Sequence, residues 1–197
     1  MRLTKPALST LILLASSPAL GHTLAPTGAG LSAGLSHPLM GFDHLLAMVG
    51  VGLWAALLGR RAIWLVPAAF MALLAGGATL ALTGWVPALT NTVLMEGGIA
   101  LSVLLLGVLL ASAMRLPVGV AMGTVAAFAL FHGAAHGAEL PVAANPWEYG
   151  IGMLVATAAL HGVGVAMGLG LDRLRTPALT RAGGVLIAAA GGLLLVA

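Results

Sequence analysis

Apolar residues fill long stretches of the chain, and short polar or proline-containing breaks separate these stretches. The breaks lie at 59–61, 84–87, 114–117, 140–146 and 172–177. Each stretch between them has about the 20 residues that a helix needs to cross the hydrocarbon core of a bilayer. The pattern predicts transmembrane helices at about 36–58, 62–83, 91–113, 118–138, 148–170 and 178–197. The Gly/Ser-rich segment 28–36 is compatible with an extra helical turn or with a re-entrant approach to the first helix.

The first residues differ from these stretches because a positive charge precedes a short apolar run. Arg2 and Lys5 come before the apolar run centred on 11–15, and the small residues Ala19 and Gly21 follow it. This order is typical of a cleavable secretory signal peptide, with an uncleaved first helix as the alternative. We predict a signal peptide at 1–21 and one transmembrane domain at 22–197. Cleavage after residue 21 would make His22 the mature N-terminus, where its imidazole and free amine could take part in metal capture.

The composition strengthens the membrane prediction and excludes several classes of protein. Of 197 residues, 60% are hydrophobic and 7% are charged, whereas soluble domains carry roughly 25% charged residues. The net charge of +3 comes from eight scattered basic residues, which form no basic stripe for nucleic acid. The absence of cysteine excludes disulfides and thiolate metal sites. We therefore expect an all-α integral membrane protein whose 28 glycines let helices pack closely.

The arginines indicate an orientation for this bundle. The second and fourth breaks contain no Lys or Arg. The arginines lie in or beside the first, third and fifth breaks: Arg60, Arg61, Arg115, Arg173, Arg175 and Arg181. By the positive-inside rule the odd breaks are cytoplasmic. The mature N-terminus and the C-terminus would then both be periplasmic, in agreement with a cleaved signal peptide.

A small set of ionisable residues lies within the predicted spans or, for Glu139, directly after one. Each costs at least about 2.5–3.5 kcal/mol at the centre of a membrane helix, so it is a candidate functional residue. The candidates are His37, Asp43, His44, Glu96, His132, His136, Glu139 and His161.

The first group lies in the run HPLMGFDH of the first predicted span. His37 and His44 are seven residues apart and should share a helix face, with Asp43 beside it and Pro38 in the first helical turn. Two imidazoles and a carboxylate suit a divalent transition metal. The alternative is an Asp–His hydrogen bond that only clamps two helices together.

The second group lies in FHGAAHGAE near the outer end of the fourth predicted span. His132, His136 and Glu139 have the i, i+4, i+7 spacing of one helix face, and small neighbours leave room for another helix. This spacing favours metal or proton handling over a solvated helix end. Glu96, expected to be buried in the third span, would bind a cation, exchange protons or remain a neutral hydrogen-bonded group. For His161 the sequence leaves two roles open, a packing role and a functional one.

No nucleotide-binding P-loop and no His-Glu-x-x-His metalloprotease motif occurs in the sequence. Any transport would therefore be passive or coupled to an ion, and no catalytic residue is assigned.

The run HPLMGFDHLLAMVGVGLWAA resembles the first-helix signature of the HupE/UreJ family, and FHGAAHGAE resembles its second signature. EGGIALSVLLLG and ATAALHGVG are similar to its glutamate-bearing and histidine-bearing helices, so the resemblance covers roughly 22–197. It implies a signal peptide followed by six spans, in the bacterial inner membrane. It also implies a nickel or cobalt permease that supplies hydrogenase or urease, without a permanently bound cofactor and functionally linked to nickel-enzyme maturation proteins.

On the matching positions, the resemblance implies a metal path with two secondary candidates, His132 and His161. Its main residues are His37, Asp43, His44, Glu96, His136 and Glu139. Two alternatives of other classes remain. One is an intramembrane zinc-dependent hydrolase with a His/carboxylate site, and the other is a non-transporting membrane subunit of a metal-enzyme assembly.

Overall fold

The structure, a computed structural model, describes residues 30–197. The predicted signal peptide at 1–21 and His22 lie outside these residues. The described part is helical, with one 3₁₀ turn, η1. Its elements are α2 (Gly30–Met40), α3 (Phe42–Leu58), α4 (Ala62–Thr83), η1 (Pro87–Thr90), α5 (Thr92–Ala111), α6 (Val118–Ala138), α7 (Pro146–Arg173) and α8 (Pro177–Leu194).

The helices from α4 to α8 are each long and apolar enough to cross a membrane. The predicted spans 62–83 and 118–138 coincide with α4 and α6, and the other three differ from their helices by a few residues. The first predicted span is different, because α2 and α3 form a pair bent by 82°. The described residues thus contain five candidate spans, or six if the bent pair crosses as one. Over residues 30–197 the chain is all-helical and of the multi-pass membrane type.

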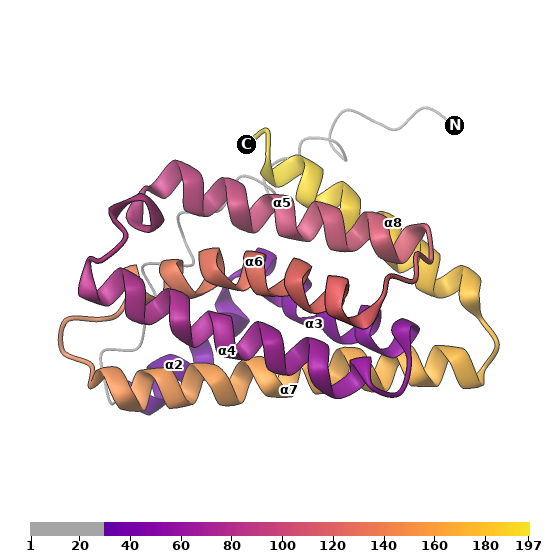
Figure 1. Ribbon diagram of the computed structural model, residues 1–197, viewed down its shortest axis with the longest axis horizontal. Helices are drawn as coiled ribbons and strands as arrows, with labels where there is room; N and C mark the ends of the chain where they lie inside the picture. Colours follow the sequence, from indigo (N-terminus) through magenta and orange to yellow (C-terminus); the bar gives the residue numbers. More distant parts are fainter. Residues whose placement is uncertain (1–29) are drawn as a thin grey trace, which may run out of the picture.

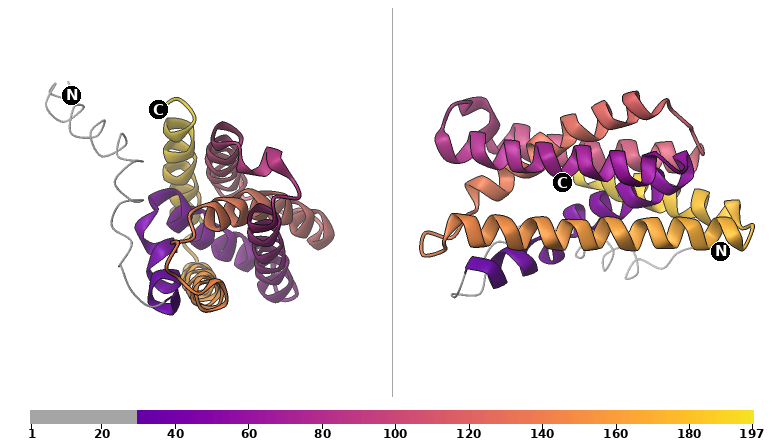
Figure 2. Two further views of the ribbon diagram at one scale, coloured as in Figure 1. Left: turned by 90° about the vertical axis from the view of Figure 1, so that its left-hand side faces the viewer. Right: turned by 60° about the horizontal axis from the view of Figure 1, so that its bottom comes forward.

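Helices α3 to α8 run side by side along the long axis of an elongated bundle, whereas α2 is bent away from α3 by 82° (Figure 1 and Figure 2). The closest neighbours are α4 with α6, α5 with α8, and α3 and α2 with α7. Helix α3 touches every other α-helix of the described chain and therefore lies at the centre of the bundle. Its Trp54 is fully buried and donates an indole N–H to the carbonyl of Met114, 3.1 Å away in the α5–α6 connection.

Glycines permit the closest helix crossings, as the composition predicts. At the α3–α7 crossing a Cβ on Gly52 would lie 2.9 Å from the Cα of Gly164, and a Cβ on Gly164 would lie 3.0 Å from the Cα of Gly52. At the α4–α6 crossing a Cβ on Gly137 would lie 2.6 Å from the carbonyl oxygen of Ala78. Side chains at these glycines would push the backbones apart. The glycines therefore bring together the helices that carry the candidate residues.

The two ends of the bundle differ in charge. The α3–α4, α5–α6 and α7–α8 connections lie at one end, on the right in Figure 1. The six arginines lie in these connections or in the helix turns next to them. We call this the arginine end. The opposite end carries the α4–α5 and α6–α7 connections together with Glu139 and Glu148, and we call it the site end. This segregation agrees with the charge pattern from which the cytoplasmic side was predicted.

Candidate metal site

The break between α2 and α3 brings the first motif into the bundle. Gly41 separates the two helices in an extended conformation, with φ −88° and ψ 115°, and precedes the first turn of α3. The prediction that His37 and His44 share one helix face is wrong, because His37 lies in the last turn of α2 and His44 in α3. Pro38 likewise lies near the end of α2 and not in a first turn. The two imidazoles approach to 6.5 Å between ring centroids because the chain bends between them.

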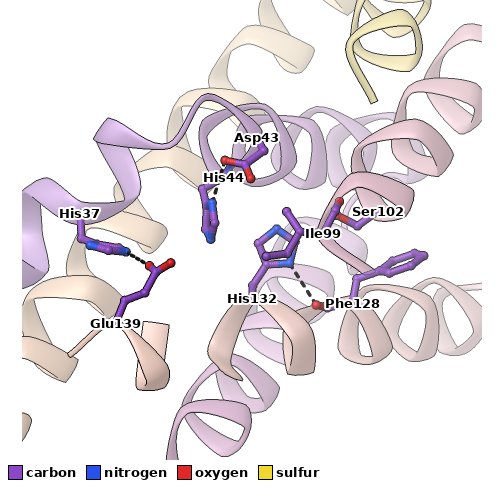
Figure 3. A network of polar contacts seen from close by, with 8 residues as sticks. All are labelled: His37, Asp43, His44, Ile99, Ser102, Phe128, His132 and Glu139. Atoms are coloured by element: carbon purple, nitrogen blue, oxygen red, sulfur yellow. Dashed lines mark hydrogen bonds and ion pairs between the residues drawn. The ribbon is translucent and has the colours of Figure 1, made fainter. Parts of the chain in front are cut away.

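Asp43 holds the ring of His44 in one orientation. Its Oδ1 accepts a hydrogen bond from the backbone N–H of His44 at 2.8 Å and lies 2.8 Å from Nδ1 of the same residue (Figure 3). An ionised carboxylate can only accept, so Nδ1 carries a hydrogen, and in the neutral imidazole Nε2 has a lone pair. This arrangement orients a metal-binding histidine in many proteins. Because the pair lies within α3, it does not clamp two helices together.

The second motif forms the buried face of α6 that the spacing predicts. His132 and His136 are fully buried, and Glu139 follows them at the end of the helix. Nδ1 of His132 lies 3.0 Å from the carbonyl oxygen of Phe128 and donates to it, since a carbonyl cannot donate (Figure 3). His132 thus also presents Nε2, as His44 does.

Four imidazoles, those of His37, His44, His132 and His136, form what we call the histidine cluster. The ring centroid of His136 lies 4.8 Å from that of His37 and 4.7 Å from that of His44. The His44 and His132 centroids are 5.1 Å apart. At the outer edge, Nε2 of His37 is 2.9 Å from Oε2 of Glu139, which joins α2 to α6 (Figure 3). Segments about a hundred residues apart in the chain therefore meet at one place.

Two members of this cluster, together with Glu139, already have the dimensions of a metal site. One ligand atom from each of His37, His136 and Glu139 lies within 4.8 Å of the others. Metal bonds to imidazole or carboxylate are about 2.0–2.2 Å long, so two ligands on opposite sides of an ion are roughly 4.2 Å apart. Only a small closing movement would be needed. Imidazole with carboxylate is a donor set that suits nickel, cobalt or zinc.

Several buried nitrogens of the cluster have no hydrogen-bond partner within residues 30–197. They are Nε2 of His44, Nε2 of His132 and both ring nitrogens of His136. A buried polar atom without a partner costs about 1–3 kcal/mol. A cation bound among these atoms would supply the missing partner, which is the behaviour expected of a site built for a ligand rather than for packing.

Two predicted residues are not members of the histidine cluster, although the charge of Glu96 is close enough to act on His44. The expectation that Glu96 is buried is wrong, because its side chain is exposed in the second turn of α5, close to the site end. The buried face of this part of α5 is formed by Met95 and Ile99, which pack against α6. His161 is buried in α7, with its ring 5.1 Å from that of Phe70 rather than against the four imidazoles.

Three residues at or near the site were not predicted. The ring of Tyr149 lies 5.8 Å from that of His37, and its hydroxyl has no partner in the described chain. Thr157 is fully buried one helical turn before His161. This i, i+4 spacing is visible in the sequence and could have pointed to Thr157. Phe70 contacts His132 at 5.5 Å, but it lies in an ordinary apolar run that gives no signal.

The bundle and its buried histidine–carboxylate cluster together define a membrane protein with a candidate metal-binding site among its helices. The chain belongs to the HupE/UreJ family, since the family model described as HupE / UreJ protein matches residues 10–194. It is similar to Protein HupE of Rhizobium leguminosarum bv. viciae, with 41% identity over 186 residues, which is 94% of this chain and 91% of the relative. No solved structure matches the chain.

Proposed function

We propose that the protein is a secondary permease for a divalent transition metal, with Ni²⁺ as the first candidate substrate and Co²⁺ as the second. Membership of the HupE/UreJ family supports a permease that serves a hydrogenase or a urease. The observation that carries the proposal is the group of buried, partnerless nitrogens on His44, His132 and His136 within residues 30–197. Such nitrogens are ligands for a passing cation.

The proposed route begins at the site end, which would face the periplasm. The metal would first meet His37, His136 and Glu139, whose donor atoms already lie close together. It would then pass to His44 and His132, deeper on α3 and α6. Exchangeable imidazole and carboxylate ligands suit transport, because a carrier must release the ion as readily as it binds it. An inside-negative potential of 100 mV would contribute about 4.6 kcal/mol for a divalent cation.

The proposal includes the orientation of the protein in the membrane and its partners. The arginine end would be cytoplasmic in the inner membrane, with the mature termini in the periplasm. The protein would hold no permanent cofactor, and its partners would be the lipid bilayer, the metal ion and, functionally, nickel-enzyme maturation proteins. The comparisons give no support to the alternative of an intramembrane zinc hydrolase.

The test is metal uptake by the purified full-length protein in liposomes that contain a metal-sensitive dye. We expect the wild type to admit Ni²⁺ or Co²⁺, and His44→Ala and His136→Ala to abolish uptake while the protein remains folded. Thr124→Ala is the control on α6, since its hydroxyl bonds only to Val120 of the same helix.

Two results would contradict the permease. One is a wild type without Ni²⁺ or Co²⁺ uptake and indistinguishable from His44→Ala. The other is zinc-dependent lipid turnover, which would favour the hydrolase. Equal loss of folded protein in both histidine variants would assign the cluster to helix packing instead.

A further inference from the structure

A row of buried polar groups runs along one face of α7. Tyr149, Thr157 and His161 are 4%, 0% and 2% exposed. Among residues 30–197, the tyrosine hydroxyl, the threonine hydroxyl and both imidazole nitrogens of His161 have no hydrogen-bond partner. Thr157 and His161 are one helical turn apart, so their polar atoms face the same side of α7.

These groups extend the histidine cluster toward the arginine end. Tyr149 contacts His37 at the site end, and His161 follows it by 12 residues of the same helix, a rise of about 18 Å. That distance is more than half of a hydrocarbon core about 30 Å thick. His161 is therefore deep in the bundle, well beyond the outer group of His37, His136 and Glu139.

Phe70 of α4 lies between the histidine cluster and His161. Its ring centroid is 5.5 Å from that of His132 and 5.1 Å from that of His161, with both contacts edge-on. The phenyl ring is 1% exposed and contacts both imidazoles edge to face. An aromatic face attracts a cation but has no lone pair to bind a metal. A cation could pass beside this ring but would not rest there.

Packing alone does not account for the polar atoms beyond Phe70. Valine in place of Thr157 and leucine in place of His161 would fill similar volumes without leaving buried polar atoms unsatisfied. Ionisable groups retained within a membrane bundle are functional candidates by default. The pair lies next to a ring that already contacts the proposed metal route.

We propose that His161 and Thr157 form an inner transfer site for a partly hydrated divalent transition-metal cation, and that Phe70 is the gate between this site and the histidine cluster. The proposal rests on the permease function proposed above. One imidazole nitrogen and one hydroxyl oxygen would bind the cation, and water would complete its coordination. So few protein ligands give weak binding, which favours release toward the arginine end.

The first experiment compares uptake and binding in the same variants of the full-length protein. His161→Leu should lower Ni²⁺ uptake into liposomes by about 10–100-fold or more. Loss of a group that only supports a metal ligand already has an effect of this size. Thr157→Val should lower uptake less. Equilibrium dialysis in detergent should still detect Ni²⁺ bound to the outer group in both variants. Their thermal midpoints should stay the same or rise, because each substitution removes unsatisfied buried atoms.

The second experiment tests the gate with Phe70→Ala and with Trp64→Ala as control. Trp64 is an aromatic residue of the same helix, α4, but its side chain is exposed. Mg²⁺ gives up its hydration water reluctantly, so a narrow passage excludes it. We expect Phe70→Ala to admit Mg²⁺ as well as Ni²⁺, and the control to remain selective.

The outcomes separate this proposal from the permease itself. A wild type without uptake would overturn both. Normal uptake by a folded His161→Leu protein would overturn only the inner site, and a Phe70→Ala protein that still excludes Mg²⁺ would overturn the gate. If His161→Leu and His161→Gln both fail to fold, the ring holds the helices together and the inner site is refuted.

Discussion

Replacement of Gly41 by alanine probes the geometry of the metal site without removing any candidate ligand. The backbone of Gly41, at φ −88° and ψ 115°, is one that alanine adopts freely, so the break between α2 and α3 should persist. The added methyl group, however, would lie 2.9 Å from Oδ1 of Asp43 and 2.9 Å from Nδ1 of His44. The substitution therefore acts on the bond between these two side chains.

The size of the effect follows from these two distances. Non-bonded carbon contacts are most favourable at about 3.5–4.0 Å, so both atoms must move by roughly half an ångström or more. A hydrogen bond to a charged group contributes about 1.5–3 kcal/mol. With this bond weakened, His44 loses the orientation that directs Nε2 into the cluster. We expect Ni²⁺ affinity to fall by about 10–100-fold, the usual effect of losing such a supporting bond.

The assay is equilibrium Ni²⁺ binding to detergent-purified protein, followed by uptake into liposomes. Gly123→Ala on α6 is the matched control, because nothing lies within 4 Å of its added Cβ. Its binding should equal that of the wild type. Wild-type affinity and uptake in Gly41→Ala would refute the view that Asp43 positions His44 for the metal.

Three further substitutions test other parts of the structure. Asp43→Asn should lower Ni²⁺ affinity in dialysis by about 10–100-fold, whereas Asp172→Asn at the arginine end should not; equal affinities would contradict the orienting role. Glu139→Gln should slow uptake by removing the carboxylate 2.9 Å from His37, and the exposed Glu148→Gln should leave the rate unchanged. Gly133→Leu should reduce the folded fraction in size-exclusion chromatography, because its side chain would collide with the α4 backbone; a normal profile would refute that crossing.

The positions of the long helices could be predicted because hydropathy reports the length of an apolar segment directly. Helices α4 and α6 begin and end at the residues that the pattern indicates. The break at Gly41 could not be predicted in this way. The residues on both sides of it are apolar and helical, and hydropathy carries no information about a change of direction.

In the candidate site, too, the local features could be predicted and the contacts between helices could not. The spacing of His132, His136 and Glu139 is local to one helix, so their common face follows from the sequence. The approach of Phe70 to His132 depends on how α4 packs against α6, which no local pattern encodes. The exposure of Glu96 was not predicted, because a position within an apolar span does not reveal which way the side chain points.

The break at Gly41 also gives the site an electrostatic character that the side chains alone do not. A helix carries about half a positive elementary charge at its N-terminus and half a negative one at its C-terminus. The bend sets the C-terminal turn of α2, which contains His37, beside the N-terminal turn of α3. Asp43 lies in that first turn of α3, where its charge offsets the positive end. The carbonyls at the end of α2 are then the dominant backbone charge, so an approaching cation meets an attractive potential before it exchanges its first water for an imidazole.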